Sequence, residues 1–279
     1  MILMKRLRVC LSLAFLLACF DGAASSPKSA PDPRTIIEKM VKVYATASSY
    51  QDSGSVVILE SGLRGDPGSD IKLSQIVPSK KVAVVEFKTY FRRPRLFRFD
   101  WKNSIRAQPG VSVVWSTGKE VFSWTRDDAL KNGTFVLRKG SELKTYTDDA
   151  LIASGGAIYT VPSLLKEDVT HLPFSDLISN IRNPSVLREE RLDNELCYVI
   201  QGDIDGVPWV LWIGKRSYLL RKTRTVYSAR PLHPKEHVDK GEILIAEEVH
   251  NGIKMNARIA GRLFEYRPRI QADDVNLTQ

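Results

Sequence analysis

The sequence predicts a mainly β (α+β) fold, in which one curled antiparallel sheet of about ten or eleven strands encloses a few helices. Three observations carry this prediction. Apolar and polar residues alternate through many short runs, and turn residues separate neighbouring runs, so the strands follow one another in hairpin order. One amphipathic helix precedes the strands. A stretch without strand alternation, residues 143–181, interrupts them.

The first 24 residues have the three-part pattern of a secretory signal peptide. A positive start ending at Arg8 precedes an apolar run, Val9 to Phe20, and small residues follow up to Ala24. The stretch from Leu16 to Cys19 offers a rival processing site, because it resembles a bacterial lipobox in which the cysteine is acylated. We therefore expect export to the periplasm, with a lipoprotein anchored in the membrane through Cys19 as the alternative.

The remainder of the chain is expected to form a linker, residues 25–33, one domain, residues 34–270, and a polar tail, residues 271–279. Only Cys197 would remain after cleavage at Ala24, so the domain would have no internal disulfide. Cys197 lies in an apolar run and is expected to be a small buried side chain.

The charge of the mature chain favours anionic partners. Removing residues 1–24 takes three cations and one anion from the net charge of +9, which leaves +7. Such a surplus favours peripheral contact with lipid head groups. The simpler explanation is a solvated sheet surface rich in Lys and Arg. Nucleic acid is not expected as a partner of an exported protein.

The leading helix has a clear start. Asp32 suits the N-cap position and Pro33 the first helical position. The residues that share its apolar face are Ile36, Ile37, Met40, Val41, Tyr44 and Ala47.

Strands are expected on both sides of the 143–181 insertion. Asn251-Gly252 is the strongest hairpin signal, between Glu242–His250 and Ile253–Ala260. The other expected strands are Tyr50–Glu60, Ile71–Val77, Val82–Arg92, Gly133–Lys139, Val186–Leu192, Leu196–Gly202, Val207–Ile213, Tyr218–Ser228 and Phe264–Tyr266. The insertion itself is expected to hold short helices broken by Gly155-Gly156, Pro162 and Pro173.

An aromatic stretch from Phe87 to Trp124 organises the sheet. Aromatic residues two apart point to one face of a strand, so we expect a broad aromatic wall with charged residues on the opposite face. Such a wall is either ordinary core or the lining of an apolar pocket. The candidate lipid-binding residues are Phe91, Phe97, Phe99, Trp101, Trp115, Phe122, Trp124, Trp209 and Leu211.

No catalytic or cofactor motif is recognisable in the sequence. It contains no nucleophile elbow, phosphate-binding loop, dinucleotide fingerprint or His-Glu-x-x-His sequence. His233 and His237 would suit a metal only on a helix, and the neighbouring prolines argue against one. Glu247 and Glu248 are adjacent in an expected strand, so their side chains point to opposite faces. We expect no enzyme activity, no cofactor and no metal.

The aromatic stretch resembles the LolA-like superfamily of periplasmic lipoprotein-sorting proteins. Arg93 to Trp101 is similar to its Arg-Pro-x-x-Phe-x-aromatic strand, and Ser116 to Trp124 to a hairpin with the pattern Asp-Gly-Lys-x-x-Trp-x-Tyr. The pair of runs 209–213 and 218–222 is similar to a further strand pair, and Phe264 to Pro268 to the ending of a predicted periplasmic branch. Ser116 and Thr117 depart from the pattern, and the insertion is longer than the simple carrier lid.

The resemblance implies an unclosed antiparallel β-barrel, with the N-terminal helix and a helical lid packed in its mouth. It implies a cavity for acyl chains of a lipid or lipoprotein, and a lid contact by the Arg before the Pro, here Arg93. A non-enzymatic carrier-like function with an envelope receptor follows. An envelope sensor or protein-interaction domain on the same fold is the alternative, and an unrecognised hydrolase with a site in the insertion is a third.

Overall fold

The computed structural model describes residues 31–64, 73, 76–78, 80–104, 110–127, 134–140, 142–165, 178–228 and 242–267. All of these described residues belong to one compact unit, Pro31–Gln279. The expected signal peptide, the lipobox, most of the linker and the tail lie outside the described residues. No helix within the described ranges has both the length and the apolar character needed to cross a membrane.

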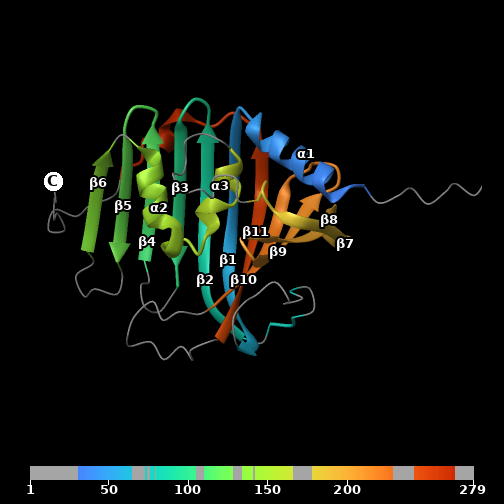
Figure 1. Ribbon diagram of the computed structural model, residues 1–279. Coiled ribbons are helices and arrows are strands. Elements are labelled where there is room, and N and C mark those ends of the chain that lie inside the picture. Colours follow the sequence, from blue (N-terminus) through green and yellow to red (C-terminus); the bar gives the residue numbers. More distant parts are fainter. Residues whose placement is uncertain are drawn as a thin grey trace, which may run out of the picture. The chain divides into compact units, whose positions relative to one another are not determined.

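The described part of the chain forms one antiparallel sheet of eleven strands in the order β6-β5-β4-β3-β2-β1-β11-β10-β9-β8-β7 (Figure 1). The edge strands β6 and β7 do not pair with each other, so the sheet is not closed, as expected. The strands are β1 (Ser49–Arg64), β2 (Lys80–Arg92), β3 (Leu96–Asn103), β4 (Gly110–Thr117), β5 (Val121–Asp127), β6 (Thr134–Gly140), β7 (Arg182–Leu192), β8 (Glu195–Ile204), β9 (Val207–Gly214), β10 (Leu220–Ser228) and β11 (Glu242–Met255).

The connections are mostly hairpins, and one long-range pairing joins the two halves of the sheet. Strand β1 lies between β2 and β11, so the first half of the chain meets the second half at the β1–β11 pair. This pairing brings residues that are about 200 positions apart in sequence onto neighbouring strands, for example Val56 opposite Glu248.

Helices cover one face of the sheet, which we call the inner face. The described helical elements are α1 (Pro33–Ala45), α2 (Leu143–Ala153), η2 (Ala157–Tyr159), α3 (Val161–Leu164) and η4 (Gly261–Phe264). The ribbons of α1, α2 and α3 run across the same side of the sheet (Figure 1). Buried side chains of α1, η2 and α3 share one hydrophobic core with Phe99 of β3 and Leu211 of β9.

Helix α1 begins and packs as its sequence predicts. The Asp32 carboxylate accepts a hydrogen bond from the Thr35 backbone N–H at 2.9 Å, and Pro33 occupies the first turn. The apolar residues Ile36, Ile37, Met40 and Tyr44 are at most 2% exposed. Burying each such side chain contributes roughly 1.5–3 kcal/mol, so packing on the sheet holds this helix in place.

The 143–181 insertion contains the expected broken helical pieces where it is described. Gly155 and Gly156 separate α2 from η2, and both have positive φ, 64° and 90°. Glycine adopts such values without the steric cost that a side chain imposes. We call residues 143–165 the lid segment; residues 166–177 lie outside the described ranges.

The expected strand Ile71–Val77 lies mostly outside the described residues, and its described residues are not in a strand. Two other local expectations are wrong. Asn251-Gly252 is not a hairpin turn, because β11 runs through both residues and Asn251 pairs with Ser53 of β1. Gly252 has φ +60° and lies at the register shift between the pairs Gln51–Lys254 and Ser53–Asn251. A glycine of this conformation also suits a β-bulge, which explains the same signal. Residues 264–266 do not form a strand, since Phe264 ends η4.

Candidate functional site

Four of the predicted lipid-binding aromatics lie on the inner face beneath the helices. Phe91, Phe97 and Phe99 are at most 1% exposed and Trp101 is 5% exposed, and all four belong to the inner core. The Phe99 ring lies 5.7 Å from that of Phe87 and 5.6 Å from that of Trp101. These residues form a continuous apolar wall.

Three other predicted residues lie on the opposite, outer face, which corrects the expectation of a single aromatic wall. Trp115 pairs with Arg98 on β3 and with Phe122 on β5, and Trp124 pairs with Val113. Phe97, in contrast, is opposite Ser116. Directly paired residues point to the same face of the sheet, and odd-numbered residues of β3 pair with even-numbered residues of β4. The odd-numbered aromatic residues of β3 therefore point to the inner face, whereas the odd-numbered Trp115 of β4 points to the outer face.

The outer aromatic residues form a cluster of their own with the C-terminal segment. The Trp115 ring stacks on Phe122 at 5.0 Å and meets the Tyr266 ring edge-on at 5.1 Å. The Arg98 guanidinium lies 4.5 Å from the centre of the Tyr266 ring and donates to the Leu263 carbonyl at 3.0 Å. This arrangement explains the burial of Trp115 and Trp124 without a ligand.

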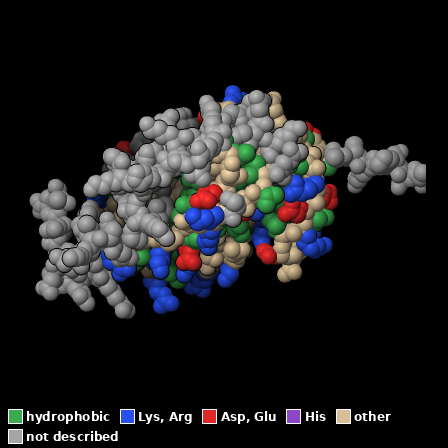
Figure 2. All heavy atoms as spheres, turned by 90° about the horizontal axis from the view of Figure 1, so that it is seen from below, with side chains coloured by type: hydrophobic (Ala, Val, Ile, Leu, Met, Phe, Trp, Pro, Cys, Tyr) green, Lys and Arg blue, Asp and Glu red, His purple; other side chains and the backbone are tan. Residues whose placement is uncertain are grey.

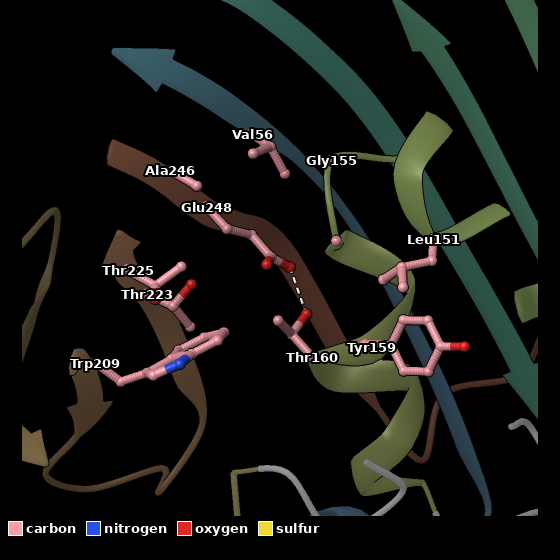
Figure 3. Close-up of a pocket in the computed structure, with 11 residues that line it drawn as sticks. Val56, Leu151, Gly155, Tyr159, Thr160, Trp209, Thr223, Thr225, Ala246 and Glu248 are labelled. Carbon is pink, nitrogen blue, oxygen red and sulfur yellow. Dashed lines mark hydrogen bonds between the residues drawn. The ribbon is translucent and has the colours of Figure 1, made fainter. Parts of the chain in front are cut away.

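Trp209 and Leu211 lie on the inner face of β9, and Trp209 lines a cavity between the sheet and the lid segment (Figure 3). The cavity has a volume of about 210 Å³. Its lining comes from four strands and the lid segment: Val56, Leu151, Gly155, Gly156, Tyr159, Thr160, Trp209, Thr223, Thr225, Ala246 and Glu248. Apolar side chains dominate, with three threonines and one carboxylate.

A buried polar cluster lies at one side of this cavity. Glu248 Oε1 accepts a hydrogen bond from the Thr160 hydroxyl at 2.5 Å and lies 3.1 Å from His250 Nε2 (Figure 3 shows the Thr160 contact). His250 Nδ1 is 2.8 Å from Asp52 Oδ2. The side chains of Asp52 and His250 are fully buried. Glu248 thus links the sheet to the lid segment.

Burial lowers the pKa of His250, whereas the carboxylates of Glu248 and Asp52 raise it. Burial disfavours the imidazolium, but Glu248 and Asp52 outweigh it and raise the pKa of His250 to about 9. The imidazole is therefore protonated at neutral pH. Burial, together with the nearby Asp52 carboxylate, also raises the pKa of the adjacent Tyr50 hydroxyl well above its ordinary value.

Local sequence patterns do not predict that these side chains form a cluster. The alternation of Glu247 and Glu248 is as expected: Glu247 lies on the outer face with Lys222 and Arg224, whereas Glu248 lies inside. Nothing local connects Asp52 to His250, because the β1–β11 pairing brings them together across 198 positions.

Arg93 lies between α1 and the lid segment. Its Nε donates to the Ala47 carbonyl at 2.8 Å, and its Nη2 donates to the carbonyls of Ala45, at 2.8 Å, and Leu165, at 2.9 Å. Leu165 is the C-cap of α3, where helix carbonyls lack partners within the helix. One guanidinium therefore ties the end of α1 to the end of the lid segment.

The metal-binding residue types and the one cysteine in the described ranges can be placed as follows. The described residues contain no group of three or more His, Cys, Asp or Glu side chains that could hold a metal ion, and His233 and His237 lie outside them. Cys197 is buried on the outer face of the sheet, and burial raises the pKa of its thiol to about 11. Figure 2 shows Lys and Arg side chains lying beside Asp and Glu on one face.

A family model described as "Predicted periplasmic protein (DUF2092)" matches residues 160–268. This match confirms the resemblance to a predicted periplasmic branch, and with it the periplasmic location. No curated protein matches the chain.

Several solved structures are similar to the chain. LprF from Mycobacterium bovis is 13% identical, with a TM-score of 0.42, over 83% of this chain and 96% of its own. A DUF1329 family protein from Desulfovibrio piger is 14% identical, with a TM-score of 0.31, over 84% and 98%. The LolA superfamily protein NE2245 from Nitrosomonas europaea is 11% identical, with a TM-score of 0.28, over 84% and 98%.

Proposed function

We propose that this protein is a non-enzymatic periplasmic carrier that binds an acyl chain of a lipid or lipoprotein between the inner face of the sheet and the lid segment. The observation that supports this most is the apolar cavity, which Trp209, Val56 and Leu151 line, directly beneath a segment with a glycine break. Apolar pockets with few polar groups are typical of sites for apolar ligands.

The cavity of about 210 Å³ is smaller than the 300–1,000 Å³ typical of ligand pockets. A long acyl chain therefore requires the lid segment to move. The buried lid side chains Ile158, Tyr159, Val161, Leu164 and Leu165 occupy the inner core in the closed form. An entering chain would take their place against Phe99 and Leu211.

This exchange sets a minimum chain length. Exposing five lid side chains costs up to about 10 kcal/mol at about 2 kcal/mol each, and each buried methylene returns about 0.8 kcal/mol. The balance is reached near 12 methylenes, on the order of the length of a common acyl chain. Octanoate should therefore bind far more weakly than palmitate. The difference in affinity should exceed the one expected from the smaller apolar area of octanoate in a pocket that is already open.

Mass spectrometry of the purified protein after organic extraction tests the proposal, together with uptake of a fluorescent fatty acid. We expect a co-purifying lipid and saturable uptake. Consistent absence of both would reject the proposal. A broad esterase and glycosidase screen tests the non-enzymatic part, and turnover of any substrate that is lost on substitution of a cavity residue would contradict it.

A further inference from the structure

We propose that the cavity contains a recognition site for a primary ammonium group, formed by Glu248 and Thr223, so that the preferred ligand is a cationic amphiphile. This inference rests on the proposed function, since the apolar part of the ligand would occupy the same cavity. It adds a head-group preference that the apolar lining by itself does not provide.

The first observation is the incomplete hydrogen bonding of Glu248. Its Oε1 accepts a hydrogen bond from the Thr160 hydroxyl and forms an ion pair with His250, whereas Oε2 has no hydrogen bond to a described residue. Glu248 is only 4% exposed and lines the cavity. A buried carboxylate oxygen that borders open space is an acceptor for a ligand donor.

The second observation is independent of the acidic cluster. Thr223 is directly opposite Glu248 in the β10–β11 pair, is 2% exposed, and lines the same cavity. Its hydroxyl has no hydrogen bond to a described residue, in contrast to that of Thr225, which donates to the Pro208 carbonyl. Glu248 Oε2 and the Thr223 hydroxyl thus both belong to residues that line the cavity, and neither atom has a hydrogen bond to a described residue (Figure 3 shows both side chains).

The charge of the cluster selects the class of ligand. Asp52 and Glu248 carry two negative charges, and among the described residues their ion-pair partner is His250. With His250 protonated the buried cluster has a net charge of −1, which is costly unless a cation compensates it. A primary ammonium supplies both the charge and the hydrogen-bond donors, and Trp209 lines the cavity as an aromatic surface that suits a cation.

The net charge of the chain allows a preference for cationic ligands to be assigned to this site. The net charge of the whole chain is +9, which favours anions through non-specific attraction. A preference for a cationic amphiphile therefore cannot come from the overall field and must come from the site. A fatty acid carboxylate, in contrast, would face the carboxylate of Glu248 at close range.

The test compares hexadecylamine, hexadecanoate and hexadecanol as competitors that displace a neutral naphthylamine fluorophore at pH 7.5. We expect hexadecylamine to displace it at a concentration at least about tenfold lower than hexadecanoate. Glu248→Gln keeps the acceptor for Thr160 but removes the charge, so it should abolish this preference. Thr223→Val should reduce the affinity for hexadecylamine by about three- to tenfold.

Glu247→Gln is the matched control, because Glu247 is the neighbouring carboxylate on the outer face. It should keep the wild-type preference. Equal displacement by the amine and the acid in the wild type, or a preference that survives Glu248→Gln, would overturn the inference while leaving apolar binding in place. If none of the three competitors displaces the fluorophore, the proposed function fails and the inference fails with it. If Glu248→Gln does not fold, the Thr223→Val result decides.

Discussion

Arg93 joins backbone carbonyls of two different elements, the end of α1 and the end of the lid segment. Its guanidinium also lies 5.2 Å from the centre of the Phe91 ring on the inner face. These contacts make it both a structural residue and a tie across the mouth of the cavity. Its position before Pro94 is what the resemblance implied, and its role in holding the lid stays a prediction.

Replacing Arg93 tests that role. In Arg93→Leu the Leu165 carbonyl loses its donor, so the lid segment should open more often and a bound fluorescent fatty acid should exchange at least about fivefold faster. The free energy of unfolding should fall by about 1–3 kcal/mol, because three hydrogen bonds are lost. Stopped-flow displacement and urea unfolding measure the two effects.

Arg92→Leu is the control for Arg93→Leu. Arg92 donates to the Ile259 carbonyl at 3.0 Å and lies over the Phe264 ring, and neither of these contacts involves the lid segment. It should lower stability without changing the exchange rate. Equal exchange rates in Arg93→Leu and the wild type would show that Arg93 is not a lid contact of consequence.

His250 makes stability depend on pH in a definite direction. Its pKa in the folded protein, about 9, is higher than its ordinary value of 6.5. The contribution of its protonated form is therefore complete below pH 6.5 and is lost as the pH rises through 9, by up to about 3 kcal/mol. Urea unfolding of the wild type and of His250→Asn between pH 6 and 10 should show a decline that only the wild type has. Parallel curves would contradict this assignment.

At the scale of elements, the two aromatic clusters have different functions in our account. Phe99 lies on the inner wall under the helices, whereas Trp115 lies on the outer face with Tyr266. Replacing either by Ala should lower the free energy of unfolding by roughly 3–5 kcal/mol, since a large buried side chain is lost. Only Phe99→Ala should also weaken fatty acid uptake, at a temperature where both variants remain folded. If only Trp115→Ala weakened uptake, the ligand would bind the outer face, which would contradict our account.

Local patterns predicted most elements, and non-local pairing decided the rest. The Asp32 N-cap, the apolar face of α1 and the glycine break in the lid segment are signals within a few residues, and each is present in the structure. The face of Trp115 depends on which residue of β3 it opposes, which parity within one strand does not determine. The Asn251-Gly252 pair favours a positive φ, and Gly252 has one. In the structure this conformation occurs at a bulge within β11 and not in a hairpin turn.

The residues of the candidate site likewise divide into those that a local pattern predicts and those that only non-local pairing brings together. Phe91, Phe97 and Phe99 were recognisable as a one-sided aromatic pattern. Asp52, Glu248 and His250 were not, because they meet only when β1 pairs with β11. A buried charged cluster has no hydrophobic periodicity, so the sequence offers no local sign of it.

At the scale of the whole molecule, the lid segment covers the apolar inner face of the sheet, and an engineered disulfide can join the two. A Cβ atom added to Gly155 would lie 3.5 Å from Val56 Cβ on β1. This separation falls within the range of about 3.5–4.5 Å seen in disulfides. The pair Val56→Cys and Gly155→Cys is therefore expected to lock the lid segment onto the sheet when oxidised, although Cys at the positive φ of residue 155 costs about 1–2 kcal/mol.

Fatty acid uptake by this double variant, before and after reduction with dithiothreitol, tests the central claim most directly. The reduced form carries the same two side chains, so it serves as the control for their bulk. If acyl chains enter beneath the lid segment, the oxidised form takes up no fluorescent fatty acid and reduction restores uptake, while the wild type responds to neither condition. Equal uptake by the oxidised and reduced forms would contradict the claim.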